Sequence, residues 1–304
     1  MRIFVTGASG WIGSAVVPEL LDAGHQVVGL ARSDTSADAL SAAGAEVVRG
    51  TIDDLDVLGS TAAASDGVIH LAFKHDIAFS GDFGGAAEAD RRAVDTFGDA
   101  LAGTDRPFVL ASGLAGLAPG QMATERDMPT IDASPLTIRA ATAEAVLALP
   151  SRGVRSCVVR LSPTCHGDGD NGFMATLVAI ARARGVSGFI GDGANHWPAV
   201  HRLDAGRLFR LAVEKAPAGS VLHGVAEEGV TIRDVAEVIG RHLDVPAVSV
   251  APDAAADHFT WLSAFLGLDI LASSSLTREA LGWEPVEPGL LADLDKGHYF
   301  HSPA

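Results

Sequence analysis

Three glycines near the N-terminus have the spacing of a phosphate-binding turn. Gly7, Gly10 and Gly13 directly follow the apolar run 3–6 and open a segment with helical periodicity. In such a turn the first glycine permits the tight bend, the second lets the backbone approach a pyrophosphate, and the third lets the helix pack on the strand. The free N–H groups of the helix N-terminus favour a negatively charged ligand. The turn therefore predicts a dinucleotide site. The other turn residues expected to contact the cofactor are Ser9, Trp11 and Ile12.

The end of the second predicted strand distinguishes NAD from NADP. An acidic residue about 20 positions after the turn would hold the ribose hydroxyls of NAD. This chain has Arg32 and Ser33 there, a guanidinium group and a hydroxyl group that can bind a 2′-phosphate. We therefore expect NADP as the cofactor, while Asp34 close by leaves some use of NAD open.

The composition excludes several classes of protein. The 22 Lys and Arg residues stand against 38 Asp and Glu residues, which gives a net charge of −16 at pH 7. Such a surface repels the phosphates of nucleic acid and anionic lipid, so we expect neither as a partner. No apolar run approaches the roughly 20 residues of a membrane span, and the N-terminus does not resemble a secretory leader. These features predict a cytoplasmic protein with a small-molecule substrate.

Metal sites and disulfides find no support in the residue pattern. Cys157 and Cys165 are the only cysteines, and they form no CxxC pair. No spacing typical of zinc ligands occurs. The segment 166–171 begins like a calcium loop, but the later ligands and the closing Glu are missing. We expect no bound metal.

Alternation of short apolar runs with helical segments predicts the fold. Unbroken apolar strands separated by helices are typical of a parallel sheet covered on both faces. Right-handed crossovers then give an α/β doubly wound sheet of Rossmann type. The predicted strands are 3–6, 26–30, 46–48, 67–71, 108–111 and 155–161. The predicted helices are 11–23, 36–43, 54–62, 84–103 and 136–149.

After residue 161 the pattern becomes irregular, with short helices separated by Gly- and Pro-rich joints. We expect a cofactor domain over 1–165 and a smaller, mostly helical substrate-covering region over 166–196 and 226–304. The segment 197–225 is expected to return to the cofactor domain, with 197–204 and 220–225 joining the main sheet.

Several segments resemble the extended branch of the short-chain dehydrogenase/reductase superfamily, which includes nucleotide-sugar epimerases and dehydratases. The glycine spacing and the segments 68–72, 108–113, 160–167 and 200–204 carry the resemblance. It implies that Leu71, Ala72 and Pro163 lie along the cofactor. It also implies that Ser112 stands at the catalytic serine position, although Gly113 or Leu114 could align there instead.

The catalytic Tyr-x-x-x-Lys motif of that superfamily is absent. Alignment on Glu144 places Leu136 and Ala140 where Tyr and Lys would stand. This departure resembles the atypical members, which keep the cofactor turn and lose the usual active-site residues. Arg139 on the same helix could replace a cation or face solvent. Tyr299, the only tyrosine, is expected to pack on the body of the protein.

Three side chains are the remaining candidates for chemistry. Ser112 could orient a substrate oxygen or only bond to the backbone. His166 could donate a proton near neutral pH or anchor its loop. Lys74 follows the fourth strand, at the edge of the sheet where ligands bind, but could also be a solvated charge.

These residues favour an NADPH-dependent reductase of a small or medium organic carbonyl, enone or imine. The missing Tyr and Lys favour a second hypothesis, a non-catalytic NADP-binding sensor or partner-binding protein. An epimerase or dehydratase of an activated sugar ranks third. Helices 84–103 and 136–149 resemble those that pair in dimers of the superfamily, so we expect a homodimer.

Overall fold

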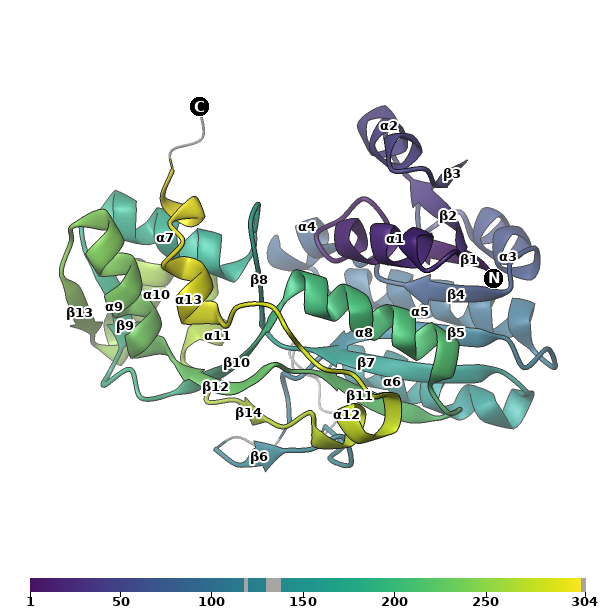
Figure 1. Cartoon of the computed structure of the whole chain (residues 1–304). Coiled ribbons are helices and arrows are strands. Elements are labelled where there is room, and N and C mark those ends of the chain that lie inside the picture. The colour runs from purple at the N-terminus through teal and green to yellow at the C-terminus, as the bar shows by residue number, and fades with distance from the viewer. Residues whose placement is uncertain (118–119, 130–137, 302–304) are drawn as a thin grey trace.

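The computed structural model describes residues 1–117, 120–129 and 138–301. Its centre is a parallel sheet of seven strands in the order β11-β7-β5-β4-β1-β2-β3 (Figure 1). The reversal of strand order beside β1 defines a doubly wound sheet, so the predicted Rossmann-type fold is confirmed. The strands are β1 (Arg2–Thr6), β2 (Gln26–Ala31), β3 (Glu46–Arg49), β4 (Gly67–His70), β5 (Pro107–Gly113), β7 (Arg155–Leu161) and β11 (Ser220–Gly224).

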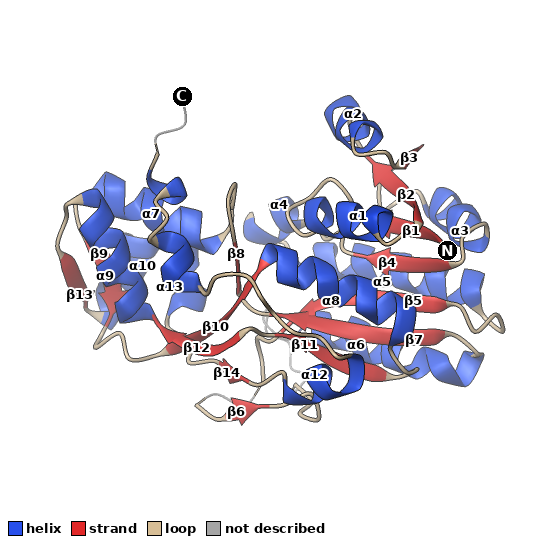
Figure 2. Ribbon diagram, viewed as in Figure 1, coloured by secondary structure: helices blue, strands red, loops and turns tan. Residues whose placement is uncertain are grey.

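Helices cover both faces of this sheet (Figure 2). Successive side chains of a strand point to opposite faces. Ile3 and Val5 of β1 accordingly belong to one apolar core, with helices α1 (Gly13–Asp22) and α8 (Arg202–Lys215). Phe4 belongs to the core on the other face, with α3 (Leu55–Ala63), α5 (Phe83–Leu101) and α6 (Ile138–Ala148). The short helices α2 (Asp34–Ala42) and α4 (His75–Phe79) follow β2 and β4.

One predicted strand lies elsewhere. We expected 197–204 to return to the main sheet, but β10 (His196–His201) pairs with β8 (Thr164–His166) and β12 (Glu227–Thr231). The edge position beside β7 is occupied by β11, whose Ser220 pairs with Cys157. Because β11 already satisfies that edge, β10 forms the centre of a second, three-stranded sheet that leads into the C-terminal region. The expected boundaries of the two regions stay a prediction.

The C-terminal region surrounds its own apolar core. The paired strands are β9 (Ser187–Ile190) with β13 (Ala247–Val250), and β6 (Met122–Ala123) with β14 (Leu271–Ala272). The helices are α7 (Phe173–Arg184), α9 (Ile232–Leu243), α10 (Ala255–Phe259), α11 (Ser263–Leu266), α12 (Ser275–Leu281) and α13 (Leu290–Leu294). Four 3₁₀ turns, η1 (Leu149–Arg152), η2 (Pro252–Ala254), η3 (Thr260–Leu262) and η4 (His298–Phe300), complete the described elements. No described helix has the length and hydropathy needed to cross a membrane.

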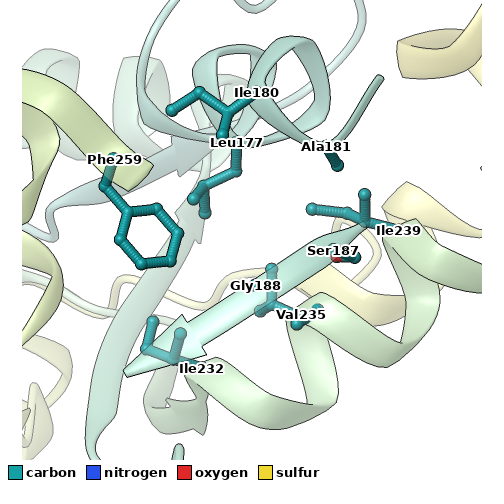
Figure 3. Close-up of a pocket in the computed structure, with 10 residues that line it drawn as sticks. Leu177, Ile180, Ala181, Ser187, Gly188, Ile232, Val235, Ile239 and Phe259 are labelled. Atoms are coloured by element: carbon teal, nitrogen blue, oxygen red, sulfur yellow. The ribbon is translucent and has the colours of Figure 1, made fainter. Parts of the chain in front are cut away.

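A small cavity lies inside this C-terminal core (Figure 3). Leu177 of α7, Ile232 of α9 and Phe259 of α10 are among the side chains that surround it. Its volume is about 10 Å³, which is room for about one water molecule. The cavity is therefore a packing void, and an organic substrate must bind elsewhere.

Candidate functional site

The glycine turn has the close packing that a phosphate-binding loop requires. Gly7 has a φ of +65°, and a Cβ atom there would lie 2.8 Å from the backbone N of Ala72. A Cβ at Gly13 would lie 2.1 Å from the carbonyl oxygen of Gly7. Gly10 donates its N–H to that same oxygen at 2.9 Å. Ser9 and Gly10 are exposed, so the tip of the turn can receive a pyrophosphate.

Trp11 joins this turn to the second sheet. Its indole Nε1 donates to the carbonyl oxygen of Cys165 at 2.8 Å, and the guanidinium carbon of Arg202 lies 4.6 Å from the centre of one of its rings. Ile12, the residue before α1, is half-buried. The turn is thus fixed against β8, which begins directly after Pro163. Direct contact of these three residues with a cofactor stays a prediction.

The end of β2 presents positive charge to solvent. The Arg32 side chain is 73% exposed, and its Nη1 lies 3.6 Å from Oδ2 of Asp76. Ser33 caps α2, because its Oγ accepts the N–H of Ser36. The carboxylate of Asp34 lies 2.7 Å from Nη2 of Arg49, so the acidic group that would favour NAD has a basic partner at the surface.

Sequence reasoning missed Arg49. It is the last residue of β3 and pairs in register with Ala31, immediately before Arg32. The sequence does show a basic residue at the end of the third predicted strand. That this residue lies beside Arg32 follows only from the parallel register of β2 and β3 in the structure.

Leu71 and Ala72 lie directly over the glycine turn. The N–H of Leu71 donates to the carbonyl oxygen of Thr6 at 3.2 Å, and that of Ala72 donates to Oγ1 of Thr6 at 3.3 Å. Ser112 stands half-buried near the end of the neighbouring β5, with Arg160 opposite it on β7. The structure therefore brings Ser112, Leu71 and Ala72 to the same edge of the sheet as the turn.

Lys74 is engaged in an ion pair. Its Nζ lies 2.6 Å from Oδ2 of Asp53, while Nη2 of Arg92 lies 3.4 Å from Oδ1 of the same carboxylate. This arrangement satisfies the ammonium group without a ligand. A role of Lys74 as proton donor stays a prediction and would require this pair to open.

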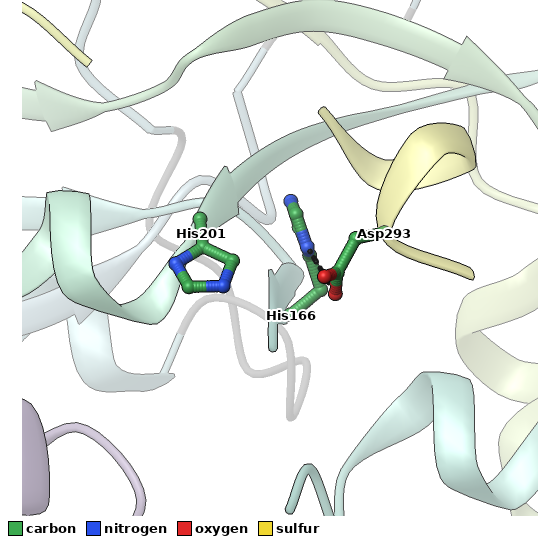
Figure 4. A group of neighbouring side chains, drawn as sticks. All are labelled: His166, His201 and Asp293. Atoms are coloured by element: carbon green, nitrogen blue, oxygen red, sulfur yellow. Dashed lines mark hydrogen bonds and ion pairs between the residues drawn. The ribbon is translucent and has the colours of Figure 1, made fainter. Parts of the chain in front are cut away.

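His166 belongs to a buried cluster in the second sheet (Figure 4). Its Nδ1 lies 3.0 Å from Oδ2 of Asp293, and its ring centre lies 5.2 Å from that of His201. All three side chains are buried, and their possible ligand atoms lie within 4.8 Å of one another. Nζ of Lys296 lies 3.2 Å from Oδ1 of Asp293, so the carboxylate has a cationic partner.

The pKa of Asp293 reflects this cluster. Burial raises this pKa, but the hydrogen bonds from His166 and Lys296 together lower it by more, so the pKa lies below its usual value. The Nε2 atom of His166 is buried and has no hydrogen-bond partner among the described residues. No local pattern in the sequence pairs His166 with a residue 127 positions away.

Tyr299 packs on the body, as expected. Its hydroxyl donates to Oδ2 of Asp170 at 3.0 Å and accepts the N–H of Gly167 at 3.1 Å. Burial and the nearby Asp170 carboxylate raise the pKa of this phenol. Its hydroxyl group is therefore committed to holding the C-terminal segment on the loop after β8.

A second buried cluster reaches the strand ends of the main sheet. Oγ1 of Thr6 lies 2.5 Å from Nδ1 of His70, and Nε2 of His70 lies 3.2 Å from Oδ1 of Asp90. Arg139 on α6 places its Nε 3.9 Å from Oδ2 of Asp90 and donates from Nη2 to the carbonyl oxygen of Ala111 at 3.0 Å. From the sequence, Arg139 could either replace the missing cation or face solvent. The structure shows its guanidinium group turned towards the protein.

Of the two positions that align with Tyr and Lys, only one is described. Ala140 is buried, with 8% exposure, on the side of α6 that faces the protein. Leu136 lies outside the described residues. On the described part of α6, Arg139 is the only basic residue.

Comparisons with known proteins agree with this geometry. The model of the NAD dependent epimerase/dehydratase family matches residues 3–223. An uncharacterised protein of Schizosaccharomyces pombe, C2A9.02, is 46% identical over 301 residues, covering 99% of this chain and 100% of that protein. A sterol-4-alpha-carboxylate 3-dehydrogenase (decarboxylating) of Dictyostelium discoideum is 28% identical over 244 residues, covering 76% and 73%.

Solved structures share the fold. The UDP-glucose 4-epimerase of Thermus thermophilus, in complex with NAD, has a TM-score of 0.76 at 20% identity and covers 98% of this chain and 99% of that one. A nicotinamide-dinucleotide fold is thus the class that the sheet and the turn define. The chain belongs to the NAD dependent epimerase/dehydratase family. The predicted resemblance to an atypical, epimerase/dehydratase-like short-chain dehydrogenase/reductase is confirmed.

Proposed function

We propose that this protein is an NADP(H)-dependent oxidoreductase that reduces a small or medium organic carbonyl, enone or imine. The observation that carries the proposal is the exposed Arg32 at the end of β2, next to a close-packed glycine turn. A dinucleotide whose pyrophosphate lies on the turn extends its 2′-phosphate towards the end of β2 and its nicotinamide towards β4 and β5. Arg32 follows β2, where it can bind the 2′-phosphate, and Ser112 lies near the end of β5, where it can face the nicotinamide.

The chain's own residues would hold the cofactor in three places. Gly7 and Ser9 offer backbone N–H groups to the pyrophosphate, and Gly10 lets the backbone approach it closely. Arg32 and Ser33 offer a guanidinium and a hydroxyl group to the 2′-phosphate, while Arg49 pairs with the Asp34 carboxylate. The remaining proposed contacts are Trp11, Ile12, Gly13, Leu71, Ala72 and Pro163.

When bound, NADPH supplies the hydride. Ser112, half-buried at the end of β5, orients the substrate oxygen through its hydroxyl group. His166 and Lys74 enter as proton-donor candidates of lower rank, because the first is fully buried on Asp293 and the second is paired with Asp53.

Two measurements test this function. NADPH should bind with a lower Kd than NADH, and Arg32→Ala should remove most of the difference. Ser33→Ala, at the adjacent position, is the matched control and should remove less, because the charge remains. Steady oxidation of NADPH over a panel of ketones, aldehydes, enones and imines should identify a substrate. Tight NADPH binding with no turnover on any of these would overturn the enzymatic part alone.

That outcome would support the second candidate, a non-catalytic NADP-binding sensor. A specific observation favours it: Lys74 and His166 are both tied to carboxylates. This candidate predicts partner capture that differs between the NADP⁺ and NADPH forms. An epimerase or dehydratase of an activated sugar ranks third and would show turnover of a nucleotide sugar without net NADPH consumption.

We further propose a cytoplasmic homodimer that acts on a small molecule and binds neither nucleic acid nor membrane. The net charge of −16 supports the last two points. Helices α5 and α6 pack side by side on one face of the sheet and would form the dimer contact. Light scattering of the purified protein tests the dimer, and a monomer mass at micromolar concentration would exclude it.

A further inference from the structure

We propose that Arg139 is the residue that stabilises the negative oxygen formed during reduction, in place of the missing Tyr and Lys. This inference rests on the proposed reductase function. It adds to that function a named group on α6 and a charge-based mechanism. Three features of Arg139 carry it: the place of its guanidinium group, the support of that group, and its partial exposure.

The place is set by two strands and a helix. Nη2 donates to the carbonyl oxygen of Ala111 at 3.0 Å, one residue before Ser112. The guanidinium carbon lies 4.1 Å from the ring centre of Phe73, which follows β4. The cation therefore lies between the ends of β4 and β5, the side of the sheet edge where the nicotinamide of a doubly wound fold lies.

The support is a buried acid. Arg139 Nε lies 3.9 Å from Oδ2 of Asp90, which is itself 1% exposed. Neither of these two atoms has a hydrogen-bond partner among the described residues. Oδ1 of the same carboxylate is held by His70 at 3.2 Å. The Asp90 carboxylate thus holds the guanidinium group in place without forming a bidentate ion pair, which would occupy its N–H donors.

The Arg139 side chain is also partly exposed, with a relative area of 26%. Its Nε lies near Asp90 and its Nη2 donates to Ala111, while Nη1 makes no hydrogen bond with a described residue. A guanidinium group that is held by such contacts and is still partly exposed can bind an oxyanion.

The step is balanced with water as the proton source. Hydride from NADPH adds to the carbonyl carbon, and the π-electron pair of the C=O bond moves to oxygen, which leaves NADP⁺ and an alkoxide. Arg139 and the Ser112 hydroxyl stabilise this alkoxide by charge and hydrogen bonding. The alkoxide then takes a proton from water and releases hydroxide. Arg139 remains a cation throughout, because a guanidinium group does not give up its proton near neutral pH.

The experiment separates this role from a structural one. Arg139→Gln should lower kcat by about 10²–10³-fold, and the NADPH Kd from fluorescence titration should change less than about threefold. Because Arg139→Gln leaves Asp90 buried without a cation, the Tm should also fall. The double variant Asp90→Asn/Arg139→Gln removes both charges. It should recover most of the Tm and none of the kcat, and added guanidinium ion should restore part of the turnover of Arg139→Ala.

Recovery of kcat together with Tm in the double variant would overturn the inference and make Arg139 a structural residue. Unchanged kcat in Arg139→Gln would overturn it as well. A wild-type protein that binds NADPH but reduces nothing would instead contradict the proposed function, so the two failures are distinguishable. Arg91→Gln, at an exposed Arg of α5 that pairs with Asp95 within its own helix, is the matched control and should change neither kcat nor Tm.

Discussion

The two regions of the molecule each contain a buried histidine–aspartate pair, and the pairs differ in what they touch. His70 and Asp90 lie under the strand ends of the main sheet and lead to Arg139, which is partly exposed. His166 of the second sheet and Asp293 of α13 lead to Lys296, near the C-terminus. The first pair points to the expected substrate position, whereas the second closes the C-terminal segment onto the body.

This difference indicates that the role of a buried histidine–aspartate pair depends on the basic residue that it contacts and on where that residue lies. The Asp90 cluster connects the glycine turn, through Thr6, with the helix that lost Tyr and Lys. The Asp293 cluster connects β8 with α13, and Tyr299 strengthens the same junction. Substitutions in the first should therefore alter turnover as well as stability, and substitutions in the second should alter stability alone.

The largest expected effect compares two glycines packed against backbone oxygens. Gly13→Ala places a Cβ atom 2.1 Å from the Gly7 oxygen, and Gly240→Ala in α9 places one 2.8 Å from the Val245 oxygen. Gly13→Ala must displace the turn, so NADPH affinity should fall at least about 100-fold. Gly240→Ala should lower the Tm while the folded fraction binds NADPH normally. Fluorescence titration at a temperature well below both Tm values checks this, and equal affinity losses would contradict the comparison.

The second prediction removes the two acidic charges. Asp90→Asn leaves the largely buried Arg139 without its counter-charge and should cost about 2–4 kcal/mol of unfolding free energy. Asp293→Asn leaves Lys296, whose side chain is 50% exposed and can be hydrated, and should cost about 1–2 kcal/mol. Denaturant unfolding of both variants measures the difference. A larger loss for Asp293→Asn would mean that the C-terminal cluster is the more strongly coupled one.

The sequence predicted the main sheet because its strands are continuous apolar runs whose meaning does not depend on distant residues. It also predicted the glycine turn and Arg32, since each lies next to the element that positions it. It did not place β10, because a short strand can pair with either of two sheets, and the choice depends on β11 filling the edge beside β7.

The clusters were beyond sequence reasoning for a related reason. Asp90 and Arg139, and likewise His166 and Asp293, come together through helix packing that no local pattern encodes. The inward direction of Arg139 also depends on which side of α6 faces α5. Periodicity alone does not decide this for a helix that is largely alanine and carries one basic residue in its described part.

The third prediction concerns the junction between the two regions. His223 of β11 donates from Nδ1 to the carbonyl oxygen of Ser273 at 2.8 Å and is fully buried. Burial lowers its pKa to about 4. Between pH 6.5 and 4 the unfolded chain therefore binds more protons at this residue than the folded protein, so the stability falls as the pH falls through that window.

The loss attributable to His223 should reach about 2–3 kcal/mol at pH 4. The control is His223→Gln, which should be less stable at pH 7 but should lose less stability on acidification. Denaturant melts of both proteins at pH 7, 6, 5 and 4 measure the two slopes. Parallel slopes would show that other groups cause the acid sensitivity, and His75, whose pKa is also lowered to about 4 by desolvation and by Arg139, would be the next residue to test.

The smallest expected effect concerns Tyr299, and it decides whether the chain's only tyrosine has taken over the lost proton donor. Tyr299→Phe removes the hydrogen bonds to Asp170 and from Gly167, which should cost about 1–2 kcal/mol of stability. The kcat for the substrate found in the panel should change less than about twofold, because the hydroxyl group is committed to the C-terminal junction. A fall of 100-fold in kcat with an unchanged Tm would reverse the comparison: the C-terminal region would then contain the proton donor, and the Asp90 cluster would be the structural one.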